Sequence, residues 1–346
     1  MITINNNMYV LDTDNTSYVF AMLGSGQLEH LYYGRKLHAN EAVMTEKHTF
    51  IPGNTNVYNK DYSSYSLEDV CLEMSSLGKG DIREPFIEVT YPNGSSTTDM
   101  VFDRAEIIQG KEEYDTLPGS YDDNGDVEQL VIYLKDRNYN LTLELHYYVY
   151  EKCDIITRSA KLVNSGNESV RLERLMSMQL DLKESDYELS FFNGAWAREM
   201  NRSRIPIRAG KYVNESVTGT SSNRANPFFM IGRSSTTEDY GECYGFNLIY
   251  SGNHYEAAQV NSYGKLRLVS GINPATFSYI IEAGKCFEAP EAVITYSYQG
   301  YNSMSHNMHE FVRKHIVRGS WRDKERPVLI NSWEAAYFNI NERKLV

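Results

Sequence analysis

The feature that most constrains the fold is a strict alternation of apolar and polar residues between positions 139 and 150. Successive side chains of a β-strand point to opposite faces, so this pattern predicts a strand with one buried face. The apolar face carries Leu141, Leu143, Leu145, Tyr147 and Val149, and the other face carries Thr142, Glu144, His146 and Tyr148.

Short apolar runs punctuated by Gly, Asn, Ser and Pro recur as far as residue 300. No fixed repeat of about 20–50 residues stands out, which argues against a propeller. The pattern predicts a mainly β protein built around a large antiparallel sandwich. The expected strands cover residues 154–163, 170–175, 228–231, 244–250, 265–269, 277–281 and 292–298.

Two segments before residue 139 are predicted to be loops. Residues 44–66 are rich in Asn, Ser and Tyr and have no periodic apolar face, which indicates a long ordered loop. Residues 110–126 end in an acidic turn, Asp122-Asp123-Asn124-Gly125-Asp126. Because its spacing does not match an EF-hand calcium loop, we interpret it as a solvated hairpin loop.

The charge balance restricts the possible partners. The 346-residue chain has 34 Lys and Arg against 46 Asp and Glu, a formal net charge of −12 at pH 7. Such a chain lacks the basic face that nucleic acid requires, and an anionic membrane surface is disfavoured for the same reason. No apolar run reaches the roughly 18 residues of a membrane-spanning helix. We expect neither nucleic acid nor a membrane as a partner.

Cysteine usage and the first residues indicate a cytoplasmic protein. Cys71, Cys153, Cys243 and Cys286 are too far apart for a zinc or redox motif. Residues 1–7 show neither a basic region nor an apolar core of a secretory signal. We therefore expect reduced thiols, and we interpret Asn-x-Ser/Thr motifs such as the one at residues 140–142 as chance matches.

The Gly-x-Gly segments at 24–26 and 78–80 are too short to be nucleotide-binding loops, so we expect no cofactor.

Near residue 302 the period changes to that of a helix. Asn302 or Ser303 can cap its start and Gly319 can close it. His309-Glu310 suggests a zinc motif, but the next His lies six residues on, so we expect no metal site. The apolar face of the helix carries Met304, Met308, Phe311, Val312 and His315.

Residues 326–334 read as a strand of a second domain. Val328-Leu329-Ile330 is a continuous apolar run, which is typical of a parallel strand buried on both faces. Such a strand needs neighbours to satisfy its backbone groups. The last twenty residues therefore look like the first β–α step of a domain that the chain does not contain.

Six phrases in order, spread over nearly the whole chain, resemble family 36 glycoside hydrolases, the bacterial α-galactosidase type. The resemblance implies a mainly β fold: a β-supersandwich over residues 1–301, a helical linker over 302–325, and the start of a catalytic (β/α)8 barrel over 326–346. The phrases are the segments at 76–83, 193–199, 226–229, 288–292, 319–324 and 326–335.

The resemblance also implies an activity. Enzymes of this family remove terminal α-galactosyl residues, as in melibiose and raffinose, by a retaining mechanism that uses two aspartates. One lies in a Lys-x-Asp-x-Asn motif and the other is the acid/base, and neither has a counterpart in this chain. We therefore predict no catalytic residue here and no activity from this chain alone.

Three residues are predicted to contact the galactoside in the complete enzyme. Trp333 and Glu334 would lie at the carboxyl end of the first barrel strand, where barrel active sites form; the alternatives are a structural role for Trp333 and a surface or supporting role for Glu334. Family members are often tetramers whose sandwich loops reach a neighbour's active site, and His48 lies in the candidate loop, beside Lys47 where an acidic-basic pair is expected. We expect a homo-oligomer. Trp196 is predicted to be a core or interface residue, with a sugar platform as the alternative.

A second hypothesis is a free-standing carbohydrate-binding or oligomerisation module that only shares ancestry with the enzymes. A module of that kind should end at its linker, near residue 320. The apolar run at 328–330 instead favours a partial α-galactosidase.

Overall fold

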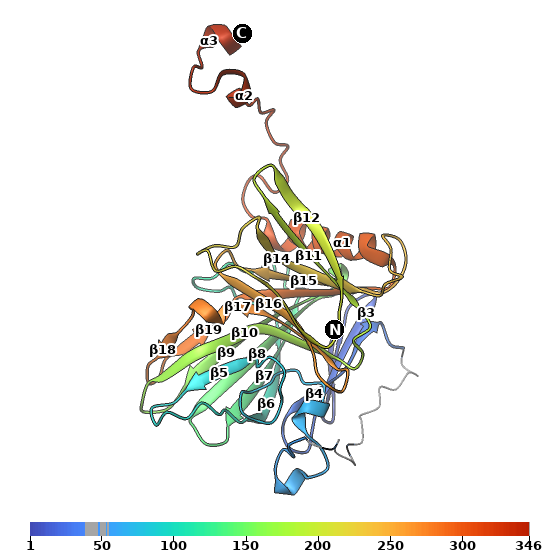
Figure 1. The fold of residues 1–346 in the computed structure, drawn as a ribbon, viewed down its shortest axis with the longest axis vertical. Coiled ribbons are helices and arrows are strands. Elements are labelled where there is room, and N and C mark those ends of the chain that lie inside the picture. Colours follow the sequence, from blue (N-terminus) through green and yellow to red (C-terminus); the bar gives the residue numbers. More distant parts are fainter. Residues whose placement is uncertain (39–47, 49–52, 54, 346) are drawn as a thin grey trace.

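The computed structural model describes residues 1–38, 48, 53 and 55–345. Its strands form three antiparallel sheets, which lie close together in one body with a C-terminal tail extending from one end (Figure 1). This confirms the mainly β antiparallel fold. Within the described residues, no helix is long and apolar enough to cross a membrane.

The first sheet is formed by the N-terminal strands in the order β1-β2-β3-β4. Sequence patterning did not predict it. These strands are β1 (Ile2–Asn5), β2 (Met8–Asp12), β3 (Thr16–Met22) and β4 (Leu28–Arg35).

The second sheet has the order β13-β16-β17-β10-β18, and β5 also pairs with β10. Strand β10 is much longer than the predicted 170–175, because it continues to residue 182 and pairs with three strands. The strands are β5 (Ile87–Thr90), β10 (Val170–Leu182), β13 (Gly210–Glu215), β16 (His254–Val260), β17 (Leu266–Ile272) and β18 (Tyr279–Ile281).

The third sheet has the order β12-β11-β14-β15-β20-β9-β8-β7-β6, and β19 pairs with β9. It contains the predicted strands at 139–150, 154–163, 228–231, 244–250 and 292–298, each within a few residues of its expected bounds. The strands are β6 (Met100–Gln109), β7 (Glu128–Asp136), β8 (Leu141–Tyr150), β9 (Ile155–Asn164), β11 (Glu188–Ala195), β12 (Arg198–Pro206), β14 (Ala225–Gly232), β15 (Cys243–Ile249), β19 (Cys286–Glu288) and β20 (Glu291–Ser297).

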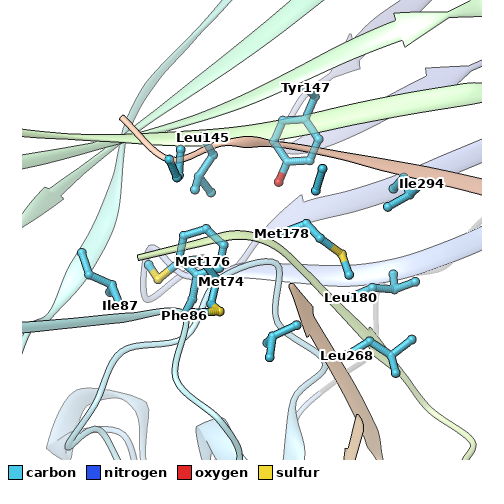
Figure 2. Packing of buried hydrophobic residues seen from close by; sticks show 14 of the residues in the cluster. Met74, Phe86, Ile87, Leu145, Tyr147, Met176, Met178, Leu180, Leu268 and Ile294 are labelled. Carbon is cyan, nitrogen blue, oxygen red and sulfur yellow. The ribbon is translucent and has the colours of Figure 1, made fainter. Parts of the chain in front are cut away.

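One hydrophobic core joins the sheets. Leu145, Tyr147 and Ile294 from the third sheet face Met178 and Leu180 from β10 of the second (Figure 2). The alternation first seen in β8 therefore exists because one face of that strand lines this core. The core fills the space between two facing sheets, as in a β-sandwich.

The helix predicted near residue 302 is present as α1 (Gly300–Phe311), but its start differs from the expected cap. The first free N–H groups of α1 are satisfied by backbone carbonyls of the 237–241 loop rather than by Asn302 or Ser303: Tyr301 N donates to Thr237 O. Tyr301, Met304 and Phe311 are buried against the third sheet.

A π-helical turn, Val312–Ile316, follows α1 and changes the direction of the predicted apolar face. The N–H of Val317 bonds the carbonyl of Val312, five residues back. This wider turn rotates the side chains that follow it relative to a regular α-helix, and Val312, where the turn begins, is 43% exposed rather than buried.

The C-terminal tail does not form the predicted strand. Residues 327–332 have no regular structure, and Val328, Leu329 and Ile330 are each more than 80% exposed. No neighbouring strand in the described chain accepts their backbone hydrogen bonds, and an isolated strand is not stable without one. The tail carries two one-turn helices, α2 (Trp333–Ala336) and α3 (Glu342–Leu345).

The remaining elements are short 3₁₀ turns. They are η1 (Lys60–Tyr62), η2 (Leu67–Asp69), η3 (Glu151–Cys153) and η4 (Pro274–Thr276).

Candidate functional site

The turn between β11 and β12 presents a tryptophan to solvent. Trp196 is 92% exposed, so the interpretation as a sandwich-core residue is wrong. A Cβ on Gly194 would lie 2.5 Å from the carbonyl oxygen of Arg198, so the turn requires glycine there. Ala197 adopts a left-handed conformation (φ 58°), and its N–H donates to the Glu199 carboxylate at 3.0 Å. We call β11, β12 and this turn the tryptophan hairpin.

The predicted galactoside-contacting residues of the tail lie on α2. Trp333 is 48% exposed, and its ring packs edge-on against Tyr337 and Phe338, with centroid distances of 5.5 and 4.9 Å. Glu334 is exposed beside it. Figure 1 shows the tail leaving from the same end of the molecule as the tryptophan hairpin. Trp196 and Trp333 are thus carried at one end of the fold.

The third predicted contact, His48, lies elsewhere. Its Nε2 is 3.0 Å from Oε1 of Glu29 on β4, and its ring is near that of Tyr65. Figure 1 places β4 at the opposite end of the molecule from α2, so one copy of the chain does not unite His48 with the tail residues. Two other aromatic residues belong to the same loop: Phe50 lies outside the described residues, and Tyr58 is buried.

A cleft of about 580 Å³ lies beside the helix that leads to the tail. Several of its charged side chains are paired: Arg322 bonds Asp123 at 3.1 Å, and Lys314 bonds Glu310 at 2.5 Å. Burial raises the pKa of the Cys153 thiol in its wall to about 11, which leaves it a poor nucleophile at neutral pH. We therefore assign the cleft no chemistry. Among the described residues, no three His, Cys, Asp or Glu side chains are grouped to hold a metal ion.

Comparisons with known proteins connect these features. The family model described as the glycosyl hydrolase family 36 N-terminal domain matches residues 26–282, and the model described as melibiase matches residues 286–346. The first match covers well over half of the chain. This chain belongs to glycosyl hydrolase family 36.

Several family 36 relatives resemble this chain along its whole length. The α-galactosidase AgaA of Geobacillus stearothermophilus is 38% identical over 342 residues, which cover 97% of this chain and 46% of that enzyme. The crystal structure of the Lactobacillus brevis α-galactosidase has a TM-score of 0.93 at 37% identity, covering 99% of this chain and 47% of its own.

A form of AgaA solved in complex with raffinose has a TM-score of 0.94 at 36% identity, covering 98% of this chain and 47% of its own. The family 36 chain described here therefore spans about half the length of these relatives. It is an N-terminal portion of such proteins.

The family 36 phrase at residues 76–83 has a structural role that sequence reasoning did not identify. Asp81 and Arg83 of this phrase meet Asp181 and Arg267 in a fully buried cluster, where Arg267 Nη2 lies 2.8 Å from Asp81 and 2.7 Å from Asp181. Burial alone would raise the pKa of Asp81, but the two guanidinium groups hold it below its ordinary value. The cluster fixes the segment before β5 to β10 and β17.

A second buried cluster surrounds Glu73. Its carboxylate accepts hydrogen bonds from Tyr18 and Tyr147, each at 2.7 Å, and lies beside His30 and Arg158. Burial opposes its charge, but Arg158 and His30 keep the pKa of Glu73 below its ordinary value. Perturbed carboxylates often mark active sites, but structural ion pairs perturb them too. Because this cluster is enclosed and joins the first sheet to β8 and β9, we assign it to stability.

Proposed function

We propose that this chain is the N-terminal half of a retaining α-galactosidase that removes terminal α-galactosyl residues from saccharides of the melibiose and raffinose type. One observation carries the proposal: the melibiase-matching tail exposes Val328, Leu329 and Ile330 almost completely. A continuous apolar run of this kind is built to be covered on both faces, as in a parallel barrel. The relatives are α-galactosidases, and one is solved with raffinose.

The chemistry of hydrolysis is expected to come from the part of the protein beyond this chain. Retaining hydrolysis needs two carboxyl groups about 5–5.5 Å apart around the scissile bond. The Lys-x-Asp-x-Asn pattern of the family nucleophile does not occur in the sequence. This chain would supply the sandwich, the linker and the first barrel strand, over residues 1–301, 302–325 and 326–346.

We further propose that Trp333 and Glu334 line the galactoside pocket once the tail is folded into a barrel. Trp333 offers an apolar ring face with an N–H donor, which suits a sugar ring. Trp196, on the tryptophan hairpin at the same end of the molecule, is a further candidate for contact with the galactoside. In the isolated chain none of these side chains is held in a pocket.

His48 is proposed to reach a galactoside only from a second copy of the protein, because its own tail lies at the other end of the fold. The complete protein would then be a homo-oligomer, and we propose a tetramer. Co-expression of full-length His48→Ala and Trp333→Ala subunits tests the arrangement. Mixed oligomers should regain activity that neither variant has alone, and absence of any regain would contradict a shared site.

We propose a cytoplasmic location. The structure places Cys71, Cys153 and Cys243 in the interior as free thiols, with Cys286 exposed. Free thiols persist most readily in a reducing compartment. Recovery of the protein in the cytoplasmic fraction of its own cells would support this, and recovery outside the cell would oppose it.

The central experiment is an assay of two proteins. This chain alone should not hydrolyse a chromogenic α-galactoside, whereas the complete protein, carrying the downstream residues, should hydrolyse it and raffinose with retention of the anomeric configuration. The Trp333→Ala variant of the complete protein should lose activity, while Trp321→Ala, an exposed control in the linker, should not. A complete protein that leaves α-galactosides intact would overturn the proposal.

A further inference from the structure

A small polar pocket of about 290 Å³ lies where the β5–β6, β7–β8 and β9–β10 turns meet. It lies at the start of β8, whereas α1 packs at the other end of that strand, where the rings of Tyr150 and Phe311 are 4.9 Å apart. A ten-residue strand separates the two places by roughly 30 Å. We call it the asparagine pocket because five of its lining residues are Asn93, Asn138, Asn140, Asn164 and Asn167.

An aromatic platform forms one wall of the asparagine pocket. The rings of Tyr91 and Tyr139 stack with centroids 3.5 Å apart and planes 10° from parallel. Tyr91 is buried, and its hydroxyl donates to Asp136, whose other oxygen accepts the N–H groups of Asn138 and Tyr139 at 2.8 and 3.0 Å. The exposed part of the Tyr139 ring is therefore held in place before any ligand arrives.

The part of the lining that the β9–β10 turn contributes is also fixed by hydrogen bonds. The buried amide of Asn164 donates to the carbonyls of Glu168 and Ile281 at 2.9 and 3.0 Å, and its oxygen accepts the N–H of Gly166. The N–H of Ser165 donates to the carbonyl of Asn140, which ties this turn to the β7–β8 turn. The pocket therefore keeps its shape without a ligand.

Three amides remain available to a ligand. Asn138, Asn140 and Asn167 are exposed, and within the described part of the chain their side chains make no hydrogen bond. Each amide offers two N–H donors and a carbonyl acceptor. This is the pattern that a ligand with several neutral hydroxyl groups can satisfy.

The charges around the pocket exclude other ligand classes. Glu168 is the one lining side chain that is charged at neutral pH, and the lining contains no Lys, Arg or His. A phosphate or nucleotide would find no cation to pair with. A single carboxylate is also too few for a calcium site, which takes several oxygen ligands including more than one acid.

We propose that the asparagine pocket binds one hexose unit of a neutral saccharide, with the Tyr139 ring against the sugar face and the amides of Asn138, Asn140 and Asn167 on its hydroxyls. Tyrosine and amide side chains combine an apolar face with neutral hydrogen-bonding groups, which suits a sugar. The inference does not rest on the proposed hydrolysis, because it concerns residues that this chain holds in full.

Calorimetric titration of residues 1–346 with galactose, maltose and raffinose, and with glucose 6-phosphate as a charged comparison, tests the inference. We expect saturable binding of at least one neutral saccharide and none of the phosphate. Tyr139→Ala should weaken that binding about tenfold, because an aromatic contact is lost. Asn140→Ala should weaken it by a smaller factor, about threefold.

Two matched controls locate the site. Tyr133→Ala removes a tyrosine from β7 outside the pocket, and Trp196→Ala removes the exposed tryptophan; neither should change the affinity. If Tyr139→Ala fails to fold, Asn140→Ala and Asn167→Ala decide the question, because both side chains are exposed. Absence of binding to all three neutral saccharides overturns the inference. So does binding that survives the pocket variants or is lost in Trp196→Ala. Binding with no α-galactosidase activity in the complete protein would refute only the proposed function.

Discussion

Replacing Glu256 with Gln is expected to stabilise the protein, and increasingly so as the pH rises. Glu256 lies on β16 and is 2% exposed. Its Oε2 accepts a hydrogen bond from Asn214 at 2.6 Å, its Oε1 has no hydrogen-bond partner, and no ion pair with it occurs within the described residues. Burial raises the pKa of Glu256 well above its ordinary value, and the Asn214 hydrogen bond offsets this only in part.

The sign follows from proton binding. Above about pH 4.5 the unfolded chain has ionised this carboxyl while the folded state keeps it protonated. The unfolded state then binds fewer protons, so the free energy of unfolding falls by about 1.4 kcal/mol per pH unit through this one group. Gln cannot ionise, so the stability gain of Glu256→Gln over the wild type should grow by up to about 1.4 kcal/mol for each pH unit over which only the folded state stays protonated.

Urea unfolding followed by circular dichroism at pH 5, 6 and 7 measures this difference. Glu112→Gln, at an exposed position of the 110–126 loop, is the matched control and should show no trend. A Glu256→Gln difference that stays constant with pH would refute the reasoning. So would a variant that is less stable than the wild type at pH 7.

Three further outcomes are expected. Arg267→Met should destabilise the fold by about 3–5 kcal/mol in urea unfolding, because it leaves the carboxylate of Asp181 buried without that guanidinium. Gly194→Ala should distort the tryptophan hairpin, since its Cβ would meet the Arg198 carbonyl, and proteolysis after Arg198 should become faster than in the wild type. Burial lowers the pKa of His254 to about 4, so the free energy of unfolding should decrease as the pH falls from 6.5 to 4. The His254→Gln variant should show a smaller decrease over this range, and an unchanged decrease would contradict the prediction.

Alternation was the clearest strand signal in the sequence, but short apolar runs also predicted strands such as β9 and β20, which are buried at nearly every position. Strand β8 alternates between core and intermediate positions over most of its length, and it was predicted almost to its ends. Strand β12 is exposed at most positions and offers neither alternation nor an apolar run, so it was not predicted. Strand β3 was missed although it is buried at nearly every position, like β9 and β20. The apolar period of α1 was likewise visible, but the π-turn after it was not, because the turn changes the direction of the face rather than its composition.

For the candidate site, too, some features could be read from the sequence and others only from the structure. The six phrases and the apolar run at 328–330 are local, so the sequence by itself determined the family, the β architecture and the presence of a continuous apolar run near residue 330. Only the tertiary structure showed that the turn at Trp196 faces solvent, and that His48 and Trp333 lie at opposite ends of one copy. Only it brought Asp81 to Arg267, because a contact across more than a hundred residues depends on how the sheets pack and not on any local period.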